Sequence, residues 1–219
     1  MNIKYEIDSK NKKTLIKCFE TNYDATVNSN ISIMSSPRLR NDDRFAVAAS
    51  LMLSDVISGE LILDTDFGCS SYIATAIQSF FSPVNVIVSP QSLTPIKQPI
   101  GSYTAYMSLD ESLDCNIDRS DKFGMSLKFV MGGAGSLYSE NSAVIGVNFS
   151  SNIDNPTDEI HSVLRHIGAA LIFADDLQIA AIKLDGNFTS KQSVIILKKA
   201  QKLLAAVHLK LIFNHFDKR

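Results

Sequence analysis

Apolar side chains recur with the period of an α-helix in four stretches of the chain. In the first stretch, Phe45, Ala48, Ala49, Met52 and Val56 stand at i, i+3, i+4, i+7 and i+11, so they would line one face of a helix. The same period predicts three more helices. The four predicted helices span residues 45–56, 73–80, 160–171 and 196–207.

Residue types that cap helix N-termini precede each of these stretches. Side chains of Asn, Asp, Ser and Thr accept hydrogen bonds from the free backbone N–H groups of a first helical turn, and Pro suits the first helical position. The predicted caps are Asn41, Asp42 and Asp43 before the first helix, Ser70 and Ser71 before the second, Asn155 and Pro156 before the third, and Thr189 and Ser190 before the fourth. They support the helix starts that the apolar period predicts.

Short runs rich in β-branched and aromatic residues lie between the helices and predict strands. The runs are 31–34, 61–63, 84–88, 144–149, 179–184 and 209–213, with further strand-like runs at 103–107 and 125–131. Residues 3–7 predict an edge or crossover strand, and residues 10–13 predict a solvated turn.

In chain order, the series strand–helix–strand–helix–strand occurs twice, over residues 28–90 and 142–216. Asp64 and Asp185 each end a predicted strand, and each is followed by a Gly-containing turn and a Ser that opens a helix. This correspondence favours an internal duplication, although any α/β protein can yield two such stretches by chance. With residues 91–141 as a β-rich connection, we expect a single α/β domain over residues 1–219. It would hold two pseudo-symmetric βαβαβ units with mixed sheets.

Composition indicates an ordinary globular protein in a reducing compartment. The 219 residues carry 21 basic and 23 acidic side chains, so no basic excess suggests a nucleic-acid partner. The longest apolar stretch, residues 167–174, is far too short to span a membrane. Charges at Lys4, Glu6 and Asp8 prevent a signal-peptide core, and the three cysteines form no C-x-x-C pair. A cytoplasmic location follows as the expectation.

Several sites of known chemistry are not indicated. The run Gly132-Gly133-Ala134-Gly135 predicts a tight hairpin turn rather than a phosphate loop, because strand-like residues follow it in place of a helix. The four histidines have spacings that place them on different faces, so no metal site is expected. Cys69 and Ser70 would be nucleophiles only with a base from elsewhere, and helix capping explains Ser70 better. No cofactor is expected.

The most informative segment for chemistry is Pro37-Arg38-Leu39-Arg40-Asn41-Asp42-Asp43-Arg44, which precedes the first predicted helix. Cations beside a helix N-terminus, where backbone N–H groups are free, suit a small dianion such as a phosphate or a carboxylate. Asp42 and Asp43 weaken this interpretation, since they can cap the helix and pair with the arginines themselves. A functional anion site and an internal ion-pair cluster are both open.

This segment resembles the start of the enolpyruvate transferases, the family of the shikimate-pathway carboxyvinyltransferase and its UDP-N-acetylglucosamine relative. There a P-G-S-K-S-x-x-x-R-A run enters an Ala/Leu-rich helix, followed by a Gly turn and a strand that ends in Asp. Residues 160–171 resemble a later Ala/Leu-rich helix of the family, and residues 184–192 resemble its strand–Gly–Ser-Lys turn. Residues 91–140 match no part of the pattern.

The resemblance implies a set of ligand-binding residues. Arg40 would stand where the family's first-motif Lys contacts carboxylate and phosphate groups, and Arg44 where its helix-start Arg does the same. Thr157, Asp158 and Glu159 would occupy the family's Ser-Ser-Gln, which binds the phosphorylated co-substrate. Two carboxylates at that place repel a phosphate, so the usual co-substrate fits poorly.

Four further residues complete the expected site. Ser190 and Lys191 match the family's Ser-Lys turn and would also bind the ligand. Asp64 and Asp185 are candidates for general acid or base because both end strands, and capping of the strand ends is the alternative.

Family members have two such domains with the chemistry in the cleft between them, and this chain has the length of one. The resemblance therefore implies a divergent or half-length enolpyruvyl (carboxyvinyl) transferase-like protein that binds a small anionic metabolite. A homodimer or a second protein chain would complete the cleft. The alternative is a non-catalytic binding or assembly module that keeps the fold and has lost the active site.

Overall fold

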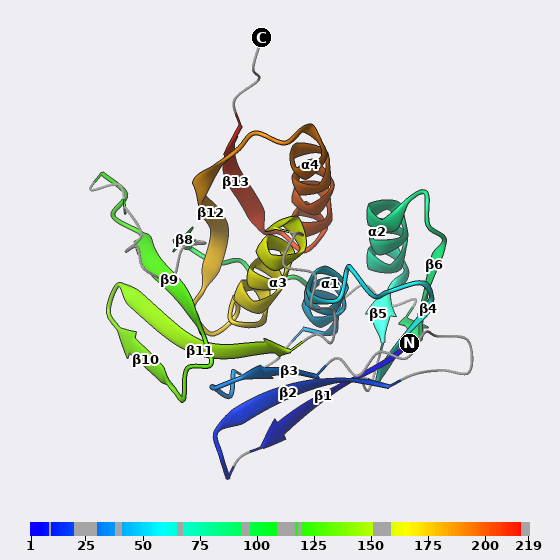
Figure 1. Cartoon of the computed structure of the whole chain (residues 1–219), viewed down its shortest axis with the longest axis horizontal. Helices are drawn as coiled ribbons and strands as arrows, with labels where there is room; N and C mark the ends of the chain where they lie inside the picture. The colour runs from blue at the N-terminus through cyan, green and yellow to red at the C-terminus, as the bar shows by residue number, and fades with distance from the viewer. Residues whose placement is uncertain are drawn as a thin grey trace.

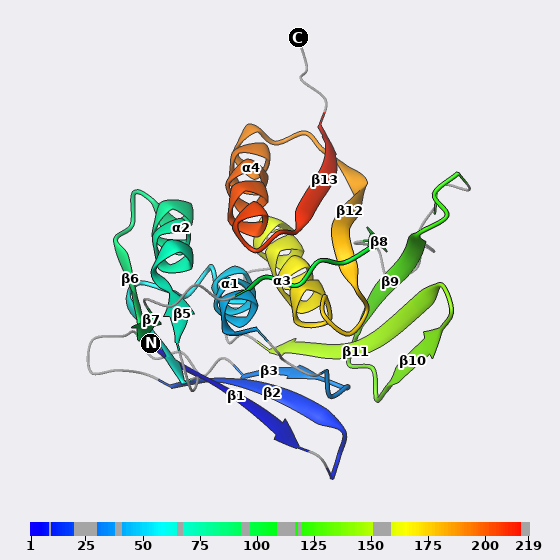
Figure 2. The ribbon, with the colours of Figure 1, turned by 180° about the vertical axis from the view of Figure 1, so that it is seen from behind.

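The computed structural model describes residues 1–8, 10–19, 30–37, 41–64, 68–92, 97–108, 117, 120–150 and 159–215. Within them, an eleven-stranded mixed sheet curves around four helices (Figures 1 and 2). The helices are α1 (Asp42–Met52), α2 (Ser71–Phe81), α3 (Glu159–Ile172) and α4 (Lys191–Ala206). The structure therefore confirms the predicted α/β class with a mixed sheet.

The sheet runs in the order β13-β12-β8-β9-β11-β3-β2-β1-β4-β6, with β10 paired to β11 beside this path. A separate two-stranded sheet pairs β5 with β7. The strands are β1 (Asn2–Asp8), β2 (Lys13–Phe19), β3 (Asn30–Ile33), β4 (Gly59–Asp64), β5 (Cys69–Ser70), β6 (Val86–Ser89), β7 (Gln91–Ser92), β8 (Tyr103–Ser108), β9 (Gly124–Met131), β10 (Ser136–Ser139), β11 (Ser142–Ser150), β12 (Ile179–Phe188) and β13 (Lys210–His215).

The sheet has two halves that meet where β3 and β11 pair antiparallel, with Ile33 opposite Val147. In one half the strands lie in the order β3-β2-β1-β4-β6, and in the other in the order β11-β9-β8-β12-β13. The halves differ at their second strand, because β2 is antiparallel to both neighbours whereas β9 is parallel to both of its own. The segment 91–141 thus supplies two interior strands of the second half.

Helix α1 forms the centre of the core. Every residue from Asp43 to Met52 is buried, and Phe45 packs edge-on against Tyr5 with ring centroids 5.6 Å apart. α3 lies directly against α1: a Cβ at Gly168 would come within 2.5 Å of the Met52 Cγ and 2.7 Å of the Ala48 carbonyl oxygen. Small residues therefore let the two helix backbones touch.

The capping predictions are confirmed for three helices. The Asn41 side chain accepts a hydrogen bond from the Arg44 N–H at 3.0 Å, Ser70 caps α2, and Ser190 caps α4. The predicted caps Asn155 and Pro156 lie outside the described residues. Local side-chain acceptors thus set the start of these helices, as the sequence predicts.

Three details of the prediction are wrong. The first helix ends at Met52 instead of residue 56, because Leu53 leaves helical geometry while its N–H still bonds to Ala49. The strand at residues 2–8 is interior, since β2 and β4 pair with its two edges. β12 continues past Asp185 to Phe188, so Asp185 does not end its strand.

Candidate functional site

The predicted anion site centres on the first turn of α1, whose position Asn41 fixes. Its side chain accepts from the Arg44 N–H at 3.0 Å and donates from Nδ2 to the Lys97 carbonyl at 3.3 Å. The cap therefore ties the helix start to the segment that leads into β8. Asp43 and Arg44 follow on this turn, and both side chains are directed into the protein.

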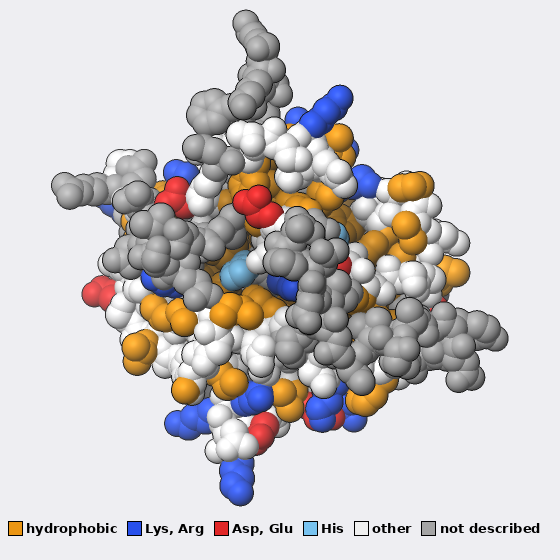
Figure 3. Space-filling model, viewed as in Figure 1, with side chains coloured by type: hydrophobic (Ala, Val, Ile, Leu, Met, Phe, Trp, Pro, Cys, Tyr) orange, Lys and Arg blue, Asp and Glu red, His pale blue; other side chains and the backbone are white. Residues whose placement is uncertain are grey.

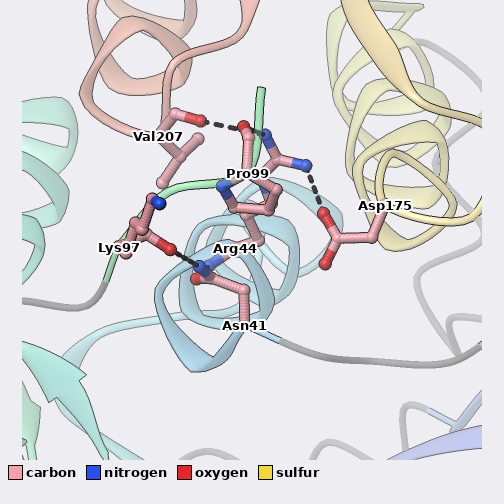
Figure 4. Close-up of polar contacts among 6 residues, drawn as sticks. All are labelled: Asn41, Arg44, Lys97, Pro99, Asp175 and Val207. Carbon is pink, nitrogen blue, oxygen red and sulfur yellow. Dashed lines mark hydrogen bonds and ion pairs between the residues drawn. The ribbon is translucent and has the colours of Figure 1, made fainter. Parts of the chain in front are cut away.

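The Arg44 guanidinium joins three segments of the chain (Figure 4). It forms an ion pair with Asp175, which follows α3, and it donates to the Pro99 carbonyl at 2.7 Å and to the Val207 carbonyl at 3.4 Å. The side chains of Arg44 and Asp175 are only 2% and 8% exposed. Arg44 therefore holds the turn after α3 and the end of α4 against α1.

The electrostatics of this pair are those of the protein interior. Burial lowers the pKa of Arg44 from its ordinary value, while the Asp175 carboxylate acts to raise it. Arginine remains protonated in proteins, so the guanidinium keeps its charge and an internal carboxylate neutralises it. Among the described residues, no acceptor contacts the Arg44 Nε. Arg44, which was predicted to bind an anion, is thus paired with an internal carboxylate and does not face a cleft.

Asp43 organises a second buried cluster beside the first. Its carboxylate accepts from the Ser70 N–H at 2.6 Å, the Ser70 hydroxyl at 3.0 Å and the Gln98 amide at 2.8 Å. The Ser70 Oγ also accepts from the Ile73 N–H, so the hydroxyl acts as a helix cap. Burial, with a smaller effect of the Asp43 charge, raises the pKa of the neighbouring Cys69 thiol to about 12, which keeps it protonated and unreactive at neutral pH.

The structure does not bring the two predicted acid–base residues together. Asp64 ends β4, is exposed, and lies with its Oδ2 3.8 Å from the Lys4 Nζ. Asp185 is an exposed residue of β12, and six strands separate β12 from β4 in the sheet order. The two carboxylates therefore lie on strands in opposite halves of the sheet.

The remaining predicted ligand-binding residues are at helix starts or outside the described part. Ser190 and Lys191 open α4, and both are exposed. Glu159 is the exposed first residue of α3. Arg40, Thr157 and Asp158 lie outside the described residues.

The described ranges hold no group of three or more His, Cys, Asp or Glu side chains that could bind a metal ion. His166 donates from Nδ1 to the Ser162 carbonyl at 2.7 Å and packs between Phe129 and Phe149. No helix in this part of the chain has the length and apolar character needed to cross a membrane.

An open hollow of about 700 Å³ lies beside the turn that joins β1 and β2. The sequence pattern does not predict it. We call it the Lys12 hollow. Its walls come from the β1–β2 turn with Lys12, the segment after β3 with Ser35 and Ser36, and the start of β10 with Ser136 and Tyr138. Lys and Arg side chains gather at this edge of the molecule, at the bottom of Figure 3. The predicted solvated turn at residues 10–13 is the sequence signal closest to this site.

Hydrogen bonds fix the walls of the Lys12 hollow. The Asp8 carboxylate accepts from the Asn11 side chain at 2.7 Å, and this bond is the main cause of its lowered pKa. The Ser136 hydroxyl donates to the Met34 carbonyl at 2.6 Å, and the hydroxyl oxygens of Ser35 and Tyr138 lie 2.6 Å apart. These bonds join the segment after β3 to β10 and fix the shape of the β1–β2 turn.

The prediction of a hairpin turn at residues 132–135 is wrong, because the strands that they join, β9 and β10, both pair with β11, β9 in parallel and β10 antiparallel. The glycine run instead carries the chain from one side of β11 to the other. Residues 132–135 cross over β11 at Gly146, whose N–H donates to the Gly135 carbonyl at 2.9 Å. A Cβ on Gly146 would lie 2.4 Å from the Gly133 carbonyl oxygen, and one on Gly133 would lie 2.9 Å from the Gly146 Cα. Only glycine at both positions permits this crossing, which places Ser136 and Tyr138 beside Ser35.

We compared the chain with protein-family models, curated proteins and solved structures. No family model, curated protein or solved structure matches it.

Proposed function

We propose that this protein is a non-catalytic binding or assembly module. The observation that carries the proposal is the closed state of Arg44, whose guanidinium is buried and bonded to Asp175, Pro99 and Val207. The transferase hypothesis needs this cation to face a cleft and bind a phosphate or carboxylate. To do so here, Arg44 would have to leave an uncompensated carboxylate in the interior, at a cost of several kcal/mol.

The separation of the acid–base candidates supports the same proposal. Asp64 and Asp185 belong to strands in opposite halves of the sheet, and the Ser70 hydroxyl serves the cap of α2. The polar residues at the start of α1 therefore contribute to holding helices and connections together. We assign the first turn of α1 a structural role, with ligand or partner binding elsewhere on the molecule.

The equal strand order of the two halves supports an internal duplication. β3-β2-β1-β4-β6 and β11-β9-β8-β12-β13 have the same order, and each half places its helices after the third and fourth strands in the chain. On this basis the repeated units extend over 2–89 and 103–215, wider than 28–90 and 142–216. A relative with different strand orders in its halves would contradict the duplication.

An activity assay tests the proposed function. The purified protein is incubated with phosphoenolpyruvate and either shikimate 3-phosphate or UDP-N-acetylglucosamine, and phosphate release is measured. We expect no release above the uncatalysed rate from the wild type or from Arg44→Lys. Release by the wild type that is lost in a folded Arg44→Lys variant would overturn the proposal, because it would place Arg44 at a reacting group.

A further inference from the structure

We propose that the Lys12 hollow binds a small ligand through a carboxylate or phosphate group. This inference goes beyond the module assignment and does not depend on Arg44. It rests on the size of the hollow, its fixed walls, its charge and its unused hydrogen-bond donors.

The size of the hollow suits a small molecule. Its volume of about 700 Å³ falls in the range of roughly 300–1,000 Å³ that is typical of small-ligand sites. Three separate chain segments form it, and the bonds from Ser136 to Met34 and between Ser35 and Tyr138 hold two of them together. A ligand would therefore enter a preformed space, which reduces the entropy lost on binding.

The charge at the hollow favours an anion. Among the described residues, no carboxylate lies within ion-pair distance of the Lys12 ammonium. The carboxylate of Asp8, at the end of β1, keeps its charge while it accepts from Asn11 and from the backbone N–H of Lys10, and three lysines at 10, 12 and 13 outnumber it. The positive charge of Lys12 is thus left to attract a ligand.

The hydroxyl groups add donors for the oxygens of that anion. In the contact between Ser35 Oγ and Tyr138 Oη, one hydroxyl donates and the other accepts, so one hydroxyl hydrogen remains for a ligand. Ser36 adds an exposed hydroxyl to the same wall. The Lys12 ammonium and these hydroxyl groups can together donate hydrogen bonds to the oxygens of a carboxylate or a phosphate.

The other lining residues indicate what the rest of the ligand resembles. Ile7, 48% exposed, and Met34 contribute apolar surface next to the polar wall. A compact molecule with a short carbon body and one acidic end would cover this surface while its charge meets Lys12. We therefore assign the class of ligand as small organic acids or phosphate esters.

Titration followed by ¹H–¹⁵N NMR tests the inference on the full chain. The ligands are inorganic phosphate, phosphoenolpyruvate and succinate, which separate phosphate from carboxylate recognition, with glycerol as the uncharged control. We expect saturable shifts of the Lys12, Ser36 and Gly135 amides with at least one anion and none with glycerol. If no amide shifts at concentrations of up to about 10 mM of any anion, the proposal is overturned.

Matched variants separate a site from general attraction to a basic turn. Lys12→Gln should weaken binding about tenfold, equal to about 1.4 kcal/mol, whereas Lys10→Gln removes the same charge from the same turn outside the hollow and should change it less than twofold. Tyr138→Phe should weaken binding severalfold, and Tyr72→Phe on α2 should have no effect. Equal losses from Lys10→Gln and Lys12→Gln would contradict a defined site. Neither result bears on the phosphate-release assay, so the two proposals fail separately.

Discussion

Arg44 and Lys12 carry the same charge in two opposite environments. Arg44 is 2% exposed at the first turn of α1, and Asp175 neutralises it. Lys12 is exposed on a turn at the far end of the β1–β2 hairpin, beside a hollow lined with hydroxyl groups. Arg44, which the sequence pattern singles out as a ligand-binding residue, stabilises the core. Lys12, in a turn that the sequence predicts only to be solvated, lies beside the proposed ligand site.

The difference shows that the surroundings of a cation decide its role. A buried guanidinium is stable only with an internal partner, since desolvating an unpaired charge costs several kcal/mol. An exposed ammonium is hydrated and costs little, so it can exchange water for a ligand oxygen. Loss of Arg44 should therefore affect stability, and loss of Lys12 should affect binding.

Removing Arg44 should produce the largest effect. In Arg44→Met, Asp175 stays buried without its partner, so the free energy of unfolding should fall by about 3–5 kcal/mol. Urea unfolding measures this change. Buried Cys69, whose thiol pKa is about 12, should also react faster with a thiol reagent as the protein opens more often.

The double variant Arg44→Met/Asp175→Leu separates two possible causes of the stability lost in Arg44→Met: an unpaired Asp175 carboxylate and the loss of packing around the Arg44 side chain. Replacing both charges with apolar groups removes the unpaired carboxylate, so much of the stability should return. If the double variant is as unstable as Arg44→Met alone, the carboxylate is not the cause. Lys12→Gln serves as the control and should stay within about 0.5 kcal/mol of the wild type.

The fold was predictable where local signals agree. The period of apolar residues and the caps Asn41, Ser70 and Ser190 located three helices to within a few residues of their starts. β2 was missed because the apolar Leu15 and Phe19 lie on its outward side and the polar Thr14 on its inward side, so the alternation is incomplete. Residues of that composition become a strand through pairing with β1 and β3, which the segment itself does not indicate.

The roles of the candidate residues were harder to predict for a related reason. Asp175, the partner of Arg44, is 131 positions away, and only the contact between α1 and α3 brings it close. The walls of the Lys12 hollow come from three segments that the β11 crossing assembles. Spacing along the chain identifies charges that can bind an anion, but it does not indicate which of them the fold will bury.

The next largest effect tests how α1 is held in place. A Cβ at Gly168 would lie 2.7 Å from the Ala48 carbonyl, so Gly168→Ala should separate α1 from α3. We expect a loss of about 1–3 kcal/mol in urea unfolding, in spite of the better helix propensity of Ala. Gly135→Ala is the matched control, because a Cβ there meets no atom within 4 Å. Equal stability of the two variants would contradict the tight contact between α1 and α3 at Gly168.

Lys12→Gly should change stability little, in contrast to the variants of Arg44 and Gly168. Lys12 has a backbone φ of 50°, in the left-handed region that favours glycine. Glycine relieves this strain but gains backbone freedom in the unfolded chain, so the net change should stay below about 1 kcal/mol. In the same variant, anion binding measured at the Ser36 amide should weaken about tenfold, as in Lys12→Gln. Weakened binding with an intact fold would show that the hollow uses the charge of Lys12, whereas unchanged binding would assign the charge no role in the hollow.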